Sequence, residues 1–154
     1  MKRLICSFGF GLFALLMLSS WAAAQKNVTP AIDRDPILEQ DAKHNLDVAW
    51  QAFGPARKAY KQVLLRFEET FAAYPDFSKM DEFLYLAGMS SYYLSENKGK
   101  QKVDLKSEKE KDKYSPERLK ENAVAYLAMV VDKYHDSKYR PDAEATLKLL
   151  KESK

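Results

Sequence analysis

A six-residue turn that recurs sixty residues later is the feature that most constrains how this chain folds. The two copies are Tyr74-Pro75-Asp76-Phe77-Ser78-Lys79 and Tyr134-His135-Asp136-Ser137-Lys138-Tyr139. Each copy follows an amphipathic apolar run that ends in an aromatic residue, and each precedes another helical run. A turn that returns in the same helical context predicts a helical repeat, in which neighbouring units bury one another's apolar faces.

Apolar residues recur at three- and four-residue steps along most of the chain, which predicts about five helices. Asp35 and Ser115 each precede a proline and are expected to cap helices. The run over 80–94 is apolar on nearly all sides, so its helix should lie between others. No segment alternates like a strand. The predicted fold class is all-α, with antiparallel helix pairs forming an α-solenoid over 35–154.

Residues 1–24 are predicted to be a signal peptide rather than part of that fold. Two basic residues precede an apolar run over 4–18, and small residues follow it. This layout predicts cleavage between Ala24 and Gln25. An uncleaved membrane anchor is the alternative, but the apolar run is shorter than the ~20 residues that a spanning helix needs. Residues 25–34 would then form a flexible lead-in.

Cys6 is the only cysteine of the chain. It lies near the start of the apolar run, whereas a bacterial lipoprotein carries its cysteine just after that run. Lipidation of Cys6 is therefore not expected, and cleavage of the leader would remove it. The mature chain is predicted to have no disulfide and no thiolate metal site.

The charge of the mature chain is nearly balanced. The whole sequence has 25 basic and 22 acidic residues, and two of the basic ones, Lys2 and Arg3, lie in the leader. The remaining 23 basic residues give a formal charge of about +1. This balance gives no support for nucleic-acid binding.

Residues 96–113 differ in composition from the rest of the chain. Seven lysines and five acids make up twelve of these eighteen residues. Such a segment cannot bury enough apolar surface to order itself, so we expect a charged, disordered insertion that is solvated. The alternative is a loop that docks on anionic lipid or an acidic partner. Its candidate electrostatic residues are Lys98, Lys100, Lys102 and Lys106.

The pattern around the turns resembles tetratricopeptide repeats, in which two antiparallel helices form each unit. Phe67 lies eight residues before Pro75, as the family's aromatic residue and proline do. Leu84, Gly88 and Tyr92 are similar to the first helix of a repeat. Together with the signal peptide, the Tyr-Pro-Asp-x-Ser phrase resembles exported proteins of the outer-membrane assembly factor BamD type and the periplasmic partner of the Tol-Pal system. The resemblance covers roughly residues 35–152.

Motifs that carry chemistry are absent from the sequence, which has no nucleophile elbow, phosphate-binding glycine loop or His-Glu-x-x-His. His44 and His135 stand on separate elements without a second ligand at helical spacing. The adjacent carboxylates Asp81 and Glu82 are expected on solvated helix faces. The sequence thus predicts no enzyme and no catalytic, cofactor or metal site.

The third predicted helix holds the strongest candidate for a binding surface. Aromatic residues and methionine are favoured at such surfaces, although a helical aromatic stripe is more often part of a core. One helix cannot bury all its sides in so small a stack. We therefore expect an exposed edge that lines a shallow groove for a partner segment, formed by Tyr85, Met89, Tyr92 and Tyr93.

The sequence favours an exported, non-enzymatic scaffold that binds protein partners at the periplasmic face of the outer membrane. The resemblance implies outer-membrane assembly components as partners, and membrane contact that is at most peripheral. The alternatives are a Tol-Pal-type adaptor, an anionic-surface binder and a small periplasmic enzyme or ligand carrier. Because the stack is shorter than the ~3 repeats that a solenoid usually needs, a partner or a second copy is expected to stabilise it.

Overall fold

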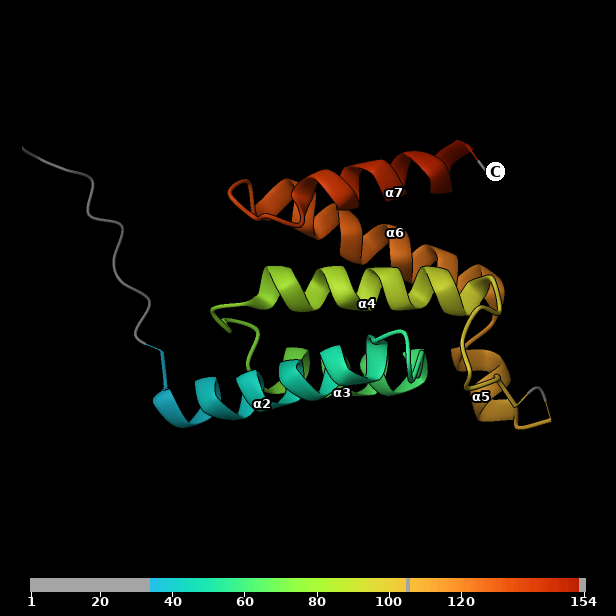
Figure 1. Cartoon of the computed structure of the whole chain (residues 1–154), viewed down its shortest axis with the longest axis horizontal. Helices are drawn as coiled ribbons and strands as arrows, with labels where there is room; N and C mark the ends of the chain where they lie inside the picture. Colours follow the sequence, from blue (N-terminus) through green and yellow to red (C-terminus); the bar gives the residue numbers. More distant parts are fainter. Residues whose placement is uncertain (1–33, 105, 153–154) are drawn as a thin grey trace, which may run out of the picture. The chain divides into compact units, whose positions relative to one another are not determined.

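The computed structural model describes residues 34–104 and 106–152, and its described part is helical without strands. Helix α2 (Pro36–Phe53) pairs with α3 (Tyr60–Ala73), and α4 (Met80–Ser95) pairs with α6 (Pro116–Lys133). A short helix α5 (Glu108–Lys113) precedes α6, and α7 (Arg140–Glu152) packs on α6. Figure 1 shows these helices as a stack, with α4 between the α2–α3 pair and the α6–α7 pair. The all-α fold of antiparallel helix pairs is confirmed.

Local sequence signals start two of the helices as expected. The Asp35 carboxylate accepts hydrogen bonds from the backbone N–H groups of Ile37 and Leu38, and Pro36 follows as the first helical residue. Ser115 Oγ likewise accepts from the Arg118 N–H at the start of α6. Both caps satisfy N–H groups that have no partner within their own helix.

The two copies of the recurring turn adopt the same backbone pattern. Tyr74 ends α3 and donates its N–H to the Thr70 carbonyl at 2.8 Å, while Tyr134 ends α6 and donates to Val130 at 3.1 Å. Three residues later, the N–H groups of Phe77 and Ser137 return to the carbonyls of Tyr74 and Tyr134. The turn therefore keeps its geometry without proline, because His135 takes the position of Pro75.

The core is continuous through the helix pairs, and α4 contributes most to it. Ten of the sixteen residues of α4 are buried, as expected for a helix packed on several sides. At Gly88 α4 lies close against α6, since a Cβ at this position would lie 2.6 Å from Leu127 Cγ. The absence of a side chain at Gly88 thus lets the two helices come close together.

Helix α3 begins at Tyr60, although apolar residues at helical spacing already precede it at Ala56 and Ala59. Residues 55–59 form a turn in which Lys58 has a φ of 46°, a left-handed conformation. The charged segment pairs with this turn, because the Lys100 N–H donates to the Lys58 carbonyl at 3.0 Å and Lys100 Nζ donates to the Ala56 carbonyl at 2.7 Å. A residue distant in sequence therefore helps to set the start of α3.

The structure also places a helix in the segment that the composition predicts to be a solvated loop. Helix α5 lies against α3 through two ion pairs: Lys61 Nζ to Glu110 Oε2 at 2.8 Å, and Lys113 Nζ to Glu68 Oε2 at 2.5 Å. Tyr114, just after α5, is buried. The charges of the segment thus pair with the charges of α3 rather than only with one another.

Replacing Lys61 by methionine should release α5, because methionine keeps most of the apolar stem and removes the charge that holds Glu110. Hydrogen exchange of the amides over 107–114 should speed up, while exchange in α4 stays unchanged. Lys109→Met is the matched control, since Lys109 is exposed and the same substitution there also removes one positive charge. Equal exchange in the two variants would show that the Lys61 pair does not hold α5.

Acid should have the same effect as the Lys61 substitution. The hydrogen bond from Lys61, and then that from the Asp104 N–H, hold the pKa of Glu110 below its usual 4.5. A carboxyl group whose pKa is lower in the docked state stabilises that state at pH values above its ordinary pKa. That preference is lost as the pH falls from 4.5 through the lowered pKa, so α5 should detach in acid.

Candidate functional site

A carboxylate between two aromatic rings connects three parts of the stack. Glu82 is in the first turn of α4, and Trp50 Nε1 of α2 donates a hydrogen bond of 2.6 Å to its Oε1. Burial raises the pKa of the Tyr139 phenol, and the hydrogen bond and charge of Glu82 raise it further. Glu82 therefore joins α4 to α2 and to the residue that precedes α7.

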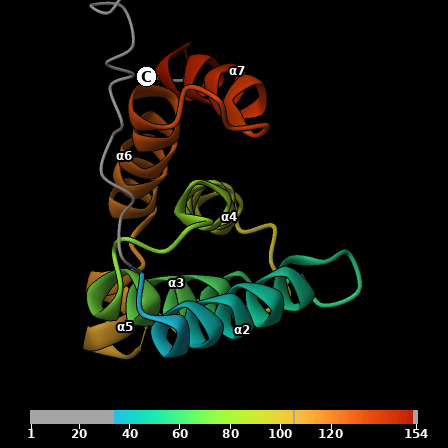
Figure 2. The same cartoon turned by 90° about the vertical axis from the view of Figure 1, so that its left-hand side faces the viewer.

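Half-buried rings continue from this carboxylate along α4 and over α2. Tyr85 stacks on Tyr139 with centroids 4.8 Å apart and an angle of 19° between the rings. Farther along, Phe53 stacks on Tyr93 at 6.0 Å. We call this set the aromatic surface; its residues are Trp50, Phe53, Tyr85, Tyr92, Tyr93 and Tyr139. In Figure 2, α2 and α7 extend to the same side of α4, where the contacts among these rings join the three elements.

A hollow of about 490 Å³ lies at the end of the aromatic surface that is formed by α2 and α4. Phe53, Tyr60 and Tyr93 contribute rings to its wall, and Lys58 and Lys98 contribute charges. Lys98 Nζ lies 5.3 Å from the centroid of Tyr92 and 5.9 Å from that of Tyr93, within the range of cation–π attraction. This end of the surface offers both apolar contact and positive charge.

Three of the four residues expected on the third predicted helix belong to the aromatic surface, namely Tyr85, Tyr92 and Tyr93. Met89 lies elsewhere, with 8% of its surface exposed. Its Sδ accepts a hydrogen bond of 3.6 Å from Thr146 Oγ1 of α7. Met89 therefore packs between α4 and α7 and presents little surface to a partner.

The four candidate lysines have different surroundings. Lys98 lies over the two tyrosines, and Lys100 donates to the Ala56 carbonyl. Lys102 and Lys106 are exposed, and their backbone groups bond to Lys61 Nζ and Asp104 Oδ1 respectively. Two of the four lysine side chains, those of Lys98 and Lys100, thus make contacts within the chain. The predicted cleavage residues Ala24 and Gln25 lie outside the described residues.

The sequence does not single out the carboxylate that connects these elements. It predicts a solvated helix face for Glu82, and it marks neither Trp50 nor Tyr139 as a site residue. A signal was present, because tryptophan and tyrosine combine a large apolar ring with a polar tip that needs a partner. Which carboxylate accepts the hydrogen bond from Trp50 Nε1 depends on the packing of α2 against α4.

In the part of the chain that the structure describes, no group of three or more His, Cys, Asp or Glu residues is arranged to hold a metal ion. The helices found there also lack the length and apolar character of a membrane span.

Comparison with known proteins places the chain in a family. No curated protein and no solved structure matches it significantly. The model of the YfiO family, described as outer membrane lipoprotein, matches residues 13–153, which is most of the chain. Cys6 lies before the matched range. The chain therefore belongs to the YfiO family of outer membrane lipoproteins and is a BamD-like protein of the tetratricopeptide-repeat type.

Proposed function

We propose that this protein is a non-enzymatic scaffold for outer-membrane protein assembly, which holds an extended segment of a partner protein on its aromatic surface at the periplasmic face of the outer membrane. The observation that carries the proposal is the row of half-buried rings across α2, α4 and the start of α7. Membership of a family described as outer membrane lipoprotein supports the location.

The chemistry of the aromatic surface suits a peptide segment. Tyrosine and tryptophan offer large contact areas with few rotatable bonds, so ordering them on binding costs little entropy. Glu82 accepts from Trp50 and leaves further lone pairs for N–H donors of a partner backbone. At the other end, Lys58 and Lys98 line the hollow, and their ammonium groups can donate hydrogen bonds to a carboxylate or a carbonyl.

Two alternatives use other features of the molecule. An adaptor of the Tol-Pal type would use the same aromatic surface for a different partner. A binder of anionic surfaces would depend on the lysines of the charged segment and would show steep salt dependence. Lys98 lies over two rings of the aromatic surface itself, and Lys100 donates to the Ala56 carbonyl, which favours the aromatic surface over a separate lysine site.

Photo-crosslinking in the cell envelope should distinguish these functions. A photoreactive amino acid at Tyr92 should capture components of outer-membrane assembly, and Tyr85→Ala in the same chain should reduce capture about tenfold or more, as for the loss of a central aromatic contact. The control places the probe at Leu65, which is 46% exposed on α3, away from the aromatic surface.

The identity of the captured proteins decides among the alternatives. Recovery of Tol-Pal components from position 92 would favour the adaptor. Equal capture from positions 92 and 65, or capture that Tyr85→Ala leaves unchanged, would contradict a role for the aromatic surface.

We further propose that residues 1–24 direct export and are removed, and that the mature chain functions without a lipid on Cys6. The exported protein should begin at Gln25 and should not incorporate a labelled fatty acid when expressed in a bacterial envelope. An Ala24→Arg variant should remain unprocessed, because cleavage requires a small residue there. A mature protein that keeps residues before Gln25, or that carries the label, would show that the leader acts as an anchor.

A further inference from the structure

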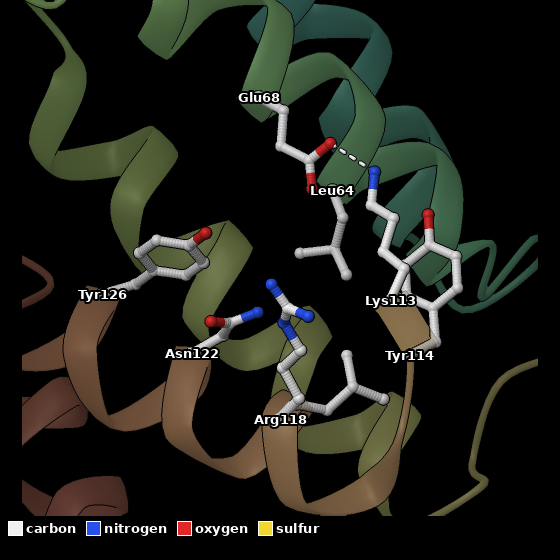
Figure 3. A pocket seen from close by; sticks show the side chains of 8 residues that line it. Leu64, Glu68, Lys113, Tyr114, Arg118, Asn122 and Tyr126 are labelled. Carbon is white, nitrogen blue, oxygen red and sulfur yellow. Dashed lines mark hydrogen bonds and ion pairs between the residues drawn. The ribbon is translucent and has the colours of Figure 1, made fainter. Parts of the chain in front are cut away.

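A second hollow lies on another side of the stack, between α3, α5 and α6. Its volume is about 300 Å³, near the lower limit for sites that bind small molecules. Leu64 of α3 and Leu119 of α6 provide apolar wall, while Lys113 of the charged segment and Tyr114, which follows it, close one side. Figure 3 shows these side chains around the hollow. The charged segment thus builds a pocket that α3 and α6 alone would leave open.

The charges around this hollow leave one cation without a partner. Glu68 is neutralised by Lys113, whose Nζ lies 2.5 Å from its Oε2. Arg118 also lines the hollow, and no ion pair or hydrogen bond of its guanidinium occurs among the described residues. Figure 3 shows the guanidinium and the Asn122 amide pointing into the same space. The pocket therefore carries a net positive charge with free hydrogen-bond donors.

We propose that this pocket binds the carboxylate of a small acid that carries a short apolar group. The planar Arg118 fork matches the two oxygens of a carboxylate, and the Asn122 amide can add a third donor. Leu64, Leu119 and the ring of Tyr126 offer the apolar contact beyond the carboxylate. The small volume excludes bulky ligands and fits either a free acid or the terminal residue of a peptide.

The end of α5 forms one wall of this pocket. The Lys113–Glu68 ion pair fixes that wall and also removes the negative charge that would repel an acid. Burial raises the pKa of the Tyr126 phenol, which keeps its hydroxyl protonated as a further donor. Ligand binding should therefore also slow hydrogen exchange in α5.

Calorimetric titration with N-acetyl-leucine and with N-acetyl-leucinamide tests the proposal, because the two probes differ only in the carboxylate. The acid should bind, and the amide should bind at least about tenfold more weakly, as expected for the loss of a charge-assisted hydrogen bond. Arg118→Gln should weaken binding of the acid by about tenfold to a hundredfold. Lys120→Gln is the matched control, since it removes the same charge from α6 outside the pocket.

A peptide arm identifies the natural source of the carboxylate. A hexapeptide that ends in leucine should bind more tightly than the free acid, and lose affinity when its terminus is amidated, if the ligand is a chain end. Tighter binding of the free acid than of the hexapeptide would indicate that the natural ligand is a small molecule. Equal binding of acid and amide, equal affinities of Arg118→Gln and Lys120→Gln in folded protein, or no acid binding at millimolar concentration would overturn the proposal.

Discussion

Replacing Phe67 by alanine should lower the free energy of unfolding by about 3–5 kcal/mol, the usual cost of deleting a buried phenylalanine. Phe67 is 1% exposed, and its ring lies 5.6 Å from that of Phe83 in α4 and 4.8 Å from that of Tyr126 in α6. It therefore joins α3 to both helices of the next pair. Because small domains are stable by only about 5–15 kcal/mol, this variant should be close to unfolding.

Urea denaturation followed by circular dichroism measures this loss. Leu65→Ala is the control on the same helix, since Leu65 is 46% exposed and its loss should cost well under about 1 kcal/mol. A Phe67→Ala variant as stable as Leu65→Ala would show that the α3 contact with α4 and α6 contributes little to the fold.

Replacing Gly88 by valine should destabilise the protein by about 1–3 kcal/mol or more, because overpacking forces neighbouring atoms to move. An added Cβ would lie 2.6 Å from Leu127 Cγ and 2.8 Å from Leu127 Cδ2, and Leu127 is fully buried. The clash involves the branch point of the side chain rather than a flexible end. Alanine at Gly54, where the nearest atoms are 3.6 Å away, is the matched control and should be nearly neutral.

A double-mutant cycle tests whether the clash with Leu127 is the cause. Leu127→Ala alone should cost about 2–5 kcal/mol through the cavity it leaves. In the double variant the valine fills part of that cavity. The stability losses of the two single variants should therefore sum to more than the loss measured for the double variant. Strict additivity would show that valine at position 88 acts through something other than Leu127.

Much of the fold is predictable from local signals. The caps at Asp35 and Ser115, the prolines that follow them and the apolar periodicity predict five of the helices, and the recurring turn predicts their pairing. These signals work because each depends on residues within about two turns of a helix. The start of α3 at Tyr60 escapes them, because the turn before it bonds to Lys100, forty-two residues beyond Lys58.

The candidate sites are less predictable than the helices. Tyr85, Tyr92 and Tyr93 are recognisable as a cluster because they lie on one helix. Helical spacing alone cannot tell that Met89 faces α7 and is buried, since that depends on how α7 folds back. The pocket around Arg118 is hidden for the same reason, because its wall comes from a segment whose composition resembles a solvated loop.

Local sequence is enough to specify paired helices with a repeated turn, because helix formation and termination follow from neighbouring residues. The surfaces that the chain presents to other molecules depend instead on how the helices pack. Glu82 comes to lie at one end of the aromatic surface when α2 and the residue before α7 bring Trp50 and Tyr139 to it. Likewise, α5 becomes a pocket wall when ion pairs bind it to α3. Surfaces and pockets depend on residues that are distant in sequence, and their contacts arise only when the helices pack.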